Sequence, residues 1–201
     1  TVTVSDDVAR LISVGLEYYQ ISNGKFDITV APLSDLWDFK SEDATVPDAD
    51  DIANALKKVG ADQISLSGNT LTFTSDDVMI DLGALVKGFA ADQLKAYLTE
   101  NGVTSGLLNL GGNVLTIGSR PDGSDWSIGI QKPFDDNKPI ADVIKVKDQT
   151  VVSSGIYERY FRQDGVIYHH ILDPDTGYPI QNDLWGVSVI CDSSLTGDAL
   201  S

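Results

Sequence analysis

Residues that form covalent cross-links or soft metal sites are scarce in this sequence of 201 residues, which has one cysteine and two histidines. A disulfide requires two cysteines, so no intrachain disulfide can form. Two histidines without a set of cysteines also fall short of a structural zinc site. Cys191 lies in the apolar run 187–191, and we interpret it as a buried core residue rather than as a nucleophile.

Positively charged residues are also few, with 14 lysines and arginines against 30 aspartates and glutamates and a formal charge of -16. Nucleic acids and anionic membrane surfaces attract basic patches, so this balance argues against both as partners. An anionic small ligand would need local lysine, local arginine or a cation to offset the field. Apolar runs are short, and none approaches the length of a membrane span.

Short helical and strand-like patterns fill the chain, and 42% hydrophobic residues are enough for a sizeable core. Helical patterns begin near Ser5, Asp50, residue 83 and Ser193, and the polar residues 40–49 are predicted to form a surface loop. The predicted strands are a hairpin over 63–74, then 78–80, 106–110, 114–118, 126–130, 143–147, 150–154, 157–162, 166–171 and 185–191. Early helices followed by a strand-rich half predict an α+β fold.

The most distinctive stretch is residues 81–92, which connects the short apolar run 78–80 to a helix through a glycine turn. The helical spacing is carried by Val86, Ala90, Leu94, Tyr97 and Leu98. A helix start presents free N–H groups and a positive dipole end, which together hold phosphates. Lys87 would add a point charge, and Asp81 is placed for a hydrogen bond or a metal. A plain strand–helix junction with a solvated lysine gives the same pattern.

Two further stretches combine glycine, asparagine and histidine in ways that suit a ligand site. In residues 109–113, paired glycines allow close approach to the backbone, and Asn109 or Asn113 offers a hydrogen bond. A bulged hairpin turn explains this stretch equally well. His169 and His170 are adjacent on a predicted strand, so they face opposite ways and at most one points into a given site. An exposed pair beside a turn is the alternative.

The end of the sequence places Asp198 and Ser201 three residues apart at the start of a predicted helix, where they share a face. Carboxylate and hydroxyl oxygens are hard ligands that suit Mg²⁺. A helix start that resembles a capping box is the alternative explanation.

Six collinear motifs together resemble the ApbE family of FAD:protein FMN transferases, and the resemblance covers nearly the whole chain. The motifs are residues 24–33 with Leu36 and Trp37, then 81–90, 109–112, 154–161, 170–179 and 198–201. One departure is Asp38, which stands where the family usually has glycine. We also expect the single flavin-transferase domain over 1–201 to lack the first strands of the family and the threonine that follows Ser201, as in a piece of a longer enzyme.

This resemblance implies a fold of the T-fold-like ApbE type and transfer of FMN from FAD to a target protein. In that reaction Mg²⁺ bridges the diphosphate of FAD, a Thr or Ser hydroxyl of the target attacks the FMN-side phosphorus, and AMP leaves. The related alternative is hydrolysis of FAD to FMN and AMP. An alternative of another class is a non-catalytic FAD-binding protein.

The resemblance also implies the site residues, the partners and the location. The metal ligands would be the Ala84 carbonyl, Asp198 and Ser201, and Asp198 and His170 would serve catalysis. Contacts to FAD would come from Trp37, Asp38, Phe39, Asp81, Lys87, His170 and Ile171. The targets would be flavoprotein subunits of respiratory or redox complexes. The full-length protein would lie outside the cytoplasm on a lipid anchor beyond this chain. Because acidic groups repel, we also expect an open groove between Ala84 and Asp198 without a cation.

Overall fold

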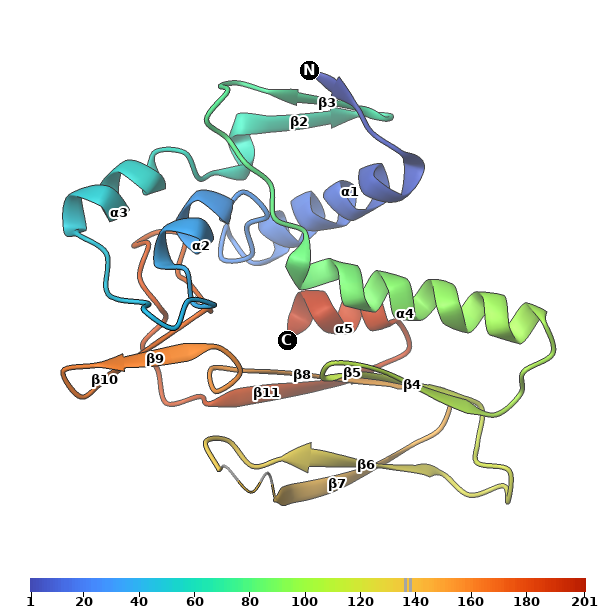
Figure 1. Cartoon of the computed structure of the whole chain (residues 1–201). Coiled ribbons are helices and arrows are strands. Elements are labelled where there is room, and N and C mark those ends of the chain that lie inside the picture. The colour runs from blue at the N-terminus through green and yellow to red at the C-terminus, as the bar shows by residue number, and fades with distance from the viewer. Residues whose placement is uncertain (136, 138) are drawn as a thin grey trace. The chain divides into compact units, whose positions relative to one another are not determined.

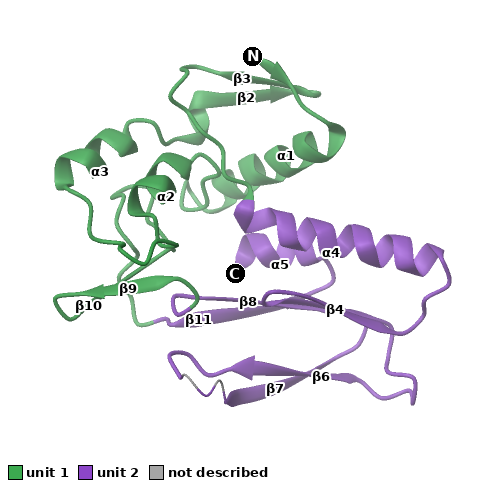
Figure 2. Cartoon of the chain, in the orientation of Figure 1, with its two compact units in different colours: residues 1–82, 158–183 green, residues 83–157, 184–201 purple. Residues whose placement is uncertain are grey.

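The computed structural model describes residues 1–135, 137 and 139–201. These residues divide into two compact units, unit 1 with residues 1–82 and 158–183, and unit 2 with residues 83–157 and 184–201 (Figure 2). Helices and antiparallel strands occur in both units, which confirms the predicted α+β class. Among the helices described, none is both long enough and apolar enough to cross a membrane.

Unit 1 combines helices with a small sheet and a hairpin (Figure 1). Its strands pair antiparallel in the orders β1-β3-β2 and β10-β9. The helix α1 begins after Ser5, whose Oγ accepts a hydrogen bond from the Val8 N–H, and Asp6 and Asp7 suit the positive end of the helix. The elements are β1 (Val2–Thr3), α1 (Asp6–Ile21), α2 (Ala31–Trp37), α3 (Ala49–Leu56), the 3-10 helix η1 (Ala61–Gln63), β2 (Ile64–Ser67), β3 (Thr70–Phe73), β9 (Tyr160–Gln163) and β10 (Val166–His169).

The core of unit 1 lies between α2 and α3 and the turn after β10. It is built from Leu33, Trp37, Ile52, Ala55 and Leu172. The predicted hairpin over 63–74 forms as β2 and β3, and β9 and β10 turn at Asp164–Gly165 as expected. The strand predicted at 78–80 is wrong, because the structure assigns no strand there. Residues 78–80 form a loop instead, and the next residue, Asp81, donates its N–H to the Ile28 carbonyl at 2.7 Å.

Unit 2 has three layers, with α4 and α5 on one face of a four-stranded antiparallel sheet and the β6–β7 hairpin on the other (Figure 1). The sheet order is β11-β8-β5-β4. Leu115 and Ile117 of β5 pack against Ala91 on the helical face, and Val151 of β8 packs against Ile128 on the hairpin face. The elements are α4 (Gly83–Glu100), β4 (Gly106–Leu110), β5 (Asn113–Ile117), β6 (Trp126–Gln131), β7 (Ile140–Val146), β8 (Thr150–Gly155), β11 (Gly186–Cys191) and α5 (Ser194–Leu200).

The helix α4 forms as predicted, but its recurring apolar residues do not make its buried face. Val86 and Tyr97 are 44% and 63% exposed, whereas Leu85, Gly88 and Ala91 are buried. Two of these three buried residues are very small, and small residues allow another backbone to come close. The buried face of α4 is therefore selected by close packing rather than by the largest apolar side chains.

Candidate functional site

The helices α4 and α5 meet at Gly88, where only a glycine fits. A Cβ atom at this position would lie 2.2 Å from the Ser194 carbonyl oxygen and 2.7 Å from the Leu195 nitrogen. Both atoms belong to the backbone of the first turn of α5, so they cannot rotate away. Gly88 thus lets the start of α5 lie directly against α4.

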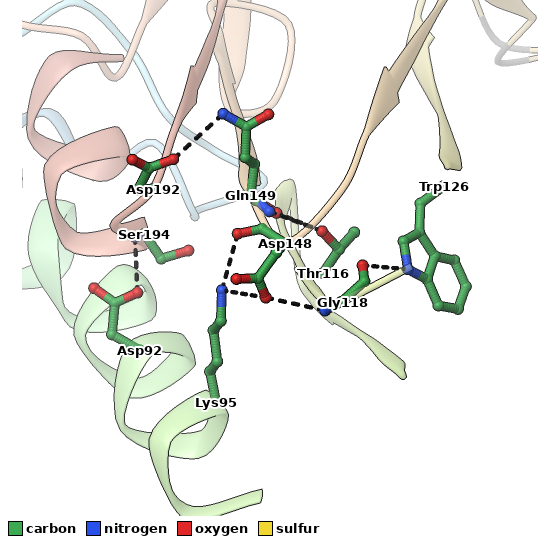
Figure 3. Close-up of polar contacts among 9 residues, drawn as sticks. All are labelled: Asp92, Lys95, Thr116, Gly118, Trp126, Asp148, Gln149, Asp192 and Ser194. Atoms are coloured by element: carbon green, nitrogen blue, oxygen red, sulfur yellow. Dashed lines mark hydrogen bonds and ion pairs between the residues drawn. The ribbon is translucent and has the colours of Figure 1, made fainter. Parts of the chain in front are cut away.

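Asp92, one turn further along α4, binds the start of α5. Its Oδ1 accepts the Ser194 N–H at 2.8 Å (Figure 3), and its Oδ2 accepts the Leu195 N–H at 3.1 Å and the Ser193 hydroxyl at 2.8 Å. Backbone N–H groups in the first turn of a helix have no partner within the helix, and a carboxylate suits the positive end of the dipole. Asp92 therefore fixes the start of α5 in position on α4.

A second polar link joins α4 to the loop that precedes β8 (Figure 3). The Lys95 ammonium lies 3.0 Å from the Asp148 carboxylate and donates to the Asp148 carbonyl at 3.0 Å. A hydrogen bond from the Gly118 N–H and the nearby Lys95 charge lower the pKa of the Asp148 carboxyl, although partial burial opposes the shift. Asp92 thus joins α4 to α5, and Lys95 joins α4 to the loop before β8.

The carboxylate of Asp198 lies inside this packing and is held by two hydrogen-bond donors. Asp198 is 8% exposed, its Oδ2 accepts the Gly88 N–H, and its Oδ1 accepts Asn113 Nδ2 at 2.8 Å. Burial raises the pKa of the Asp198 carboxyl, and the two donors together with the Lys87 charge oppose that rise. The open groove expected between Ala84 and Asp198 stays a prediction, although these two donors offset part of the charge that was expected to push the carboxylate away.

The bond from Gly88 also bears on Ala84. In a regular α-helix the N–H of residue 88 donates to the carbonyl four residues earlier, which is the carbonyl of Ala84. Here the Gly88 N–H points to the Asp198 carboxylate. Ala84 is an exposed residue in the first turn of α4. A carbonyl whose usual donor is shared with a carboxylate is suited to accept a cation.

Lys87 and the glycine pair are brought together at the same end of unit 2. The Lys87 ammonium donates to the Gly111 carbonyl at 3.1 Å. Gly111 and Gly112 form the two-residue turn between β4 and β5, with φ of 60° and 93°, in the left-handed region that favours glycine. A hairpin turn forms here, but the bulge that was expected in it is absent, because Leu110 pairs directly with Asn113.

The three predicted metal ligands lie in unit 2. Asp198 lies in the last turn of α5 and Ser201 is the C-cap residue, so both are at the end of this helix and not at its start as predicted. Ser201 Oγ lies 2.8 Å from Ser154 Oγ and donates to the Asp198 carbonyl at 3.4 Å. Within the described ranges, no group of three or more His, Cys, Asp and Glu side chains is placed to hold a metal ion. A cation here would therefore be held by one carboxylate and neutral oxygens, a donor set that fits Mg²⁺ and does not fit a soft metal.

The predicted FAD contacts Trp37 and Phe39 belong to unit 1, where the Trp37 ring is part of the core. Trp37 is 1% exposed, and its Nε1–H donates to the Gly177 carbonyl at 2.8 Å. Phe39 stacks on it with ring centroids 5.5 Å apart and an angle of 4° between the planes. Phe161, Tyr168 and Tyr178 also pack against this indole. The enclosed Trp37 ring serves packing, and its predicted contact with FAD stays a prediction.

Asp38, between those two aromatic residues, has a left-handed backbone that explains the glycine expected there. It ends α2 with φ 40° and ψ 52°, and its N–H donates to the Ser34 carbonyl. Left-handed residues commonly end helices, and glycine adopts this conformation without the steric cost of a Cβ. Aspartate is one of the few other residues that tolerate it. Asp38 therefore adopts a backbone conformation that glycine would adopt at lower steric cost.

The two histidines have different surroundings, but the strand predicted over 166–171 ends at His169, so His170 lies just after β10 and not on it. His169 is buried, and its ring nitrogens contact the Ile180 carbonyl at 2.9 Å and the Ile171 N–H at 3.3 Å. His170 is half-buried, and its Nδ1 lies 3.3 Å from the Arg159 carbonyl. Ile171 is half-buried and Asp81 exposed. The roles predicted for His170, Ile171 and Asp81 toward FAD stay predictions.

The sequence analysis did not predict the internal partners that hold Asp198. Asn109 or Asn113 was offered as one possible hydrogen-bond partner of a ligand, whereas Asn113 donates to Asp198. The structural roles of Gly88 and Asp92 were not identified. A partial signal was available for these two, because residues four apart on a helix share a face. Nothing local could show that this face meets α5.

The comparisons with known proteins agree with the motifs. The model of the ApbE family matches residues 1–201. A protein of Klebsiella pneumoniae (strain 342) named FAD:protein FMN transferase is 40% identical over 199 residues, which are 98% of this chain and 61% of that protein. A protein of the same name from Vibrio cholerae serotype O1 is 34% identical over 200 residues, which are 98% of this chain and 60% of that protein.

Solved structures give the same result for the fold. The ApbE protein of Thermotoga maritima superimposes with a TM-score of 0.91 at 36% identity, over 100% of this chain and 65% of that one. The apo form of the flavinyl transferase ApbE of Pseudomonas stutzeri superimposes with a TM-score of 0.86 at 34% identity, over 100% of this chain and 62% of that one. The chain thus spans about three fifths of the length of such relatives.

Proposed function

Because this chain belongs to the ApbE family, we propose that the protein transfers FMN from FAD to a Thr or Ser hydroxyl of a target flavoprotein and releases AMP. The observation that carries the proposal is the placement of Asp198, held by Gly88 and Asn113 beside the first turns of α4. This arrangement puts a fixed carboxylate next to the start of a long helix, and both features suit the binding of a diphosphate through a cation.

The residues proposed to hold Mg²⁺ are the Ala84 carbonyl, the Asp198 carboxylate and the Ser201 hydroxyl. Their oxygens fit a hard cation, and a bound Mg²⁺ would offset the negative charge of the diphosphate in a chain whose formal charge is -16. Lys87 adds a positive charge at the start of α4, where its ammonium already donates to the Gly111 carbonyl. We assign Lys87 to the diphosphate of FAD.

The chemistry we propose requires positioning and one proton acceptor. The target hydroxyl oxygen forms a bond to the FMN-side phosphorus, the bond from that phosphorus to the bridging oxygen breaks, and AMP leaves with the bridging oxygen. The hydroxyl proton passes to Asp198. We assign His170 to the flavin or the diphosphate, together with Trp37, Asp38, Phe39, Asp81 and Ile171.

The proposed partners and location follow from the family alone. We propose that the targets are flavoprotein subunits of respiratory or redox complexes that carry an acceptor Thr or Ser. We also propose that the full-length protein lies outside the cytoplasm and is held there by a lipid anchor beyond this chain. Detection of the target with covalently bound FMN in cells that have the gene, and its loss in cells that lack it, would test this assignment.

The direct test uses the full-length protein with FAD, Mg²⁺ and a target peptide that contains one threonine. We expect AMP release together with a peptide mass increased by one FMN, and we expect Asp198→Ala to lower the rate by at least about 100-fold, because it removes both a charged ligand and the base. Asp192→Ala is the matched control, because Asp192 is exposed and contacts Gln149 outside the site.

Three other outcomes of this experiment are informative. AMP release without modification of the peptide would favour hydrolysis of FAD. FAD binding without AMP release would favour a carrier that has no turnover. Equal rates for Asp198→Ala and the unmodified protein, at equal folded fractions, would contradict the role assigned to Asp198.

A further inference from the structure

Asn113 is a buried polar residue that the proposed reaction does not itself use. It is the first residue of β5, directly after the Gly111–Gly112 turn, and it is 0% exposed. Its Nδ2 donates to Asp198 Oδ1 at 2.8 Å, from a position 85 residues away in the chain. A buried carboxylate is costly unless donors replace its water, so this contact contributes directly to keeping Asp198 in place.

The orientation of the Asn113 amide is itself fixed by a second bond. Ser194 Oγ donates to Asn113 Oδ1 at 2.6 Å, and Ser194 is 0% exposed. Thr150 Oγ1 lies 2.7 Å from the same Ser194 oxygen. Because the serine hydroxyl occupies the carbonyl oxygen of the amide, the NH₂ group faces Asp198. The side chain is therefore held as a donor to the carboxylate rather than as an acceptor.

We propose that Asn113 is a positioning residue for Asp198, which it holds by Oδ1 while the Gly88 N–H holds Oδ2. This inference rests on the proposed role of Asp198 as a Mg²⁺ ligand. Two donors on the two oxygens set the rotation of the carboxylate and so direct its remaining lone pairs. Residues that orient a metal ligand commonly change metal affinity by about 10-fold to 100-fold when they are removed.

The proposal separates a positioning role from general stability. A residue that only stabilises the fold would change the unfolding free energy without changing the affinity of the folded protein for Mg²⁺. Thr116 provides the matched control, because it lies on the same strand, is 0% exposed and exchanges hydrogen bonds with the Gln149 backbone rather than with Asp198. Thr116→Val removes a hydroxyl that is as buried as the Asn113 amide, and it removes no hydrogen bond to Asp198.

The experiment measures the dissociation constant of Mg²⁺ by calorimetry on the full-length protein, and separately the Mg²⁺ concentration that gives half-maximal FMN transfer. For Asn113→Ala we expect both values to rise by about 10-fold or more, with a smaller change in the rate at saturating Mg²⁺. For Ser194→Ala, which frees the amide but leaves it in place, we expect a rise of about threefold. For Thr116→Val we expect no change in either value.

The results distinguish failure of this inference from failure of the proposed function on which it rests. Normal Mg²⁺ affinity in folded Asn113→Ala would overturn the inference and leave the proposed function standing. Failure of the unmodified protein to bind Mg²⁺ would overturn both. If Asn113→Ala does not fold, Ser194→Ala decides the matter, since a rise in its Mg²⁺ dissociation constant supports the inference and an unchanged value overturns it.

Discussion

Two buried clusters, one in each unit, hold family motifs in place by different means. In unit 1, Trp37 is enclosed by aromatic rings and donates its indole N–H to the Gly177 carbonyl. In unit 2, Asp198 is enclosed by α4 and β5 and depends on hydrogen-bond donors from both. Apolar packing tolerates small shifts, whereas a buried charge needs each donor in its place. Changes near Trp37 should therefore act on stability, and changes near Asp198 should act on function first.

The two units also differ in net charge, because the acidic residues are concentrated in unit 1. The 30 acidic residues divide into 20 in unit 1 and ten in unit 2, whereas the 14 basic residues divide into seven and seven. Unit 2, which contains the predicted metal ligands, is therefore much less negative than unit 1. A diphosphate meets less repulsion where the surrounding charge is smaller, so the charge distribution favours unit 2 as its binding region.

The largest expected effect is from Trp37→Ala. Removal of a fully buried indole should lower the unfolding free energy by about 3–5 kcal/mol, because it leaves a cavity among four other rings. Trp37→Phe is the control, because it keeps a ring and loses the hydrogen bond to Gly177. Urea unfolding measures both variants. A loss below about 1 kcal/mol for Trp37→Ala would contradict the packing role.

Gly88→Ala should have the next largest effect on stability and a strong effect on activity. The added Cβ meets the Ser194 carbonyl and the Leu195 nitrogen, so α5 must move away from α4, at a cost of about 3 kcal/mol. That movement also carries Asp198 away from the Gly88 N–H. Thermal unfolding and FMN transfer would be measured together.

Ala96→Ser, at an exposed position of the same helix, is the control for Gly88→Ala and should behave like the unmodified protein. If Gly88→Ala kept both stability and transfer rate, the close contact between α4 and α5 would not be required for function.

The smallest of these effects is the pH dependence that comes from His169. Burial lowers the pKa of His169 below its usual 6.5, and the Ile180 carbonyl bond opposes the shift. The unfolded chain therefore binds the proton more readily, so the contribution to stability is complete above about pH 6.5 and is lost as the pH falls toward the folded-state pKa. The slope is at most about 1.4 kcal/mol per pH unit. Unfolding measured between pH 7.5 and 5 would show this loss.

Substitution of each histidine separates the contribution of His169 to the pH dependence of stability from that of the other titrating groups. In His169→Phe the part of the pH dependence that belongs to this side chain should disappear, whereas His170→Gln should keep it. An identical pH profile for His169→Phe and the unmodified protein would show that another group is responsible.

The sequence was sufficient for the features that depend on local patterns. The family motifs, the α+β class, the helix after Ser5 and the hairpins at 67–70 and 163–166 all follow from short-range signals such as caps, glycine turns and alternation. In each case the determining residues lie within a few positions of one another.

Only the tertiary structure decided which residues surround Asp198 and Trp37. The partners of Asp198 are 85 and 110 residues away, and the Gly177 carbonyl is 140 residues from the Trp37 indole. Periodicity gives the face of a helix that is apolar, yet α4 buries Gly88 and Ala91 and leaves Val86 and Tyr97 exposed. That choice depends on how closely α5 and the sheet approach α4, and contacts between distant segments form only when the whole unit packs.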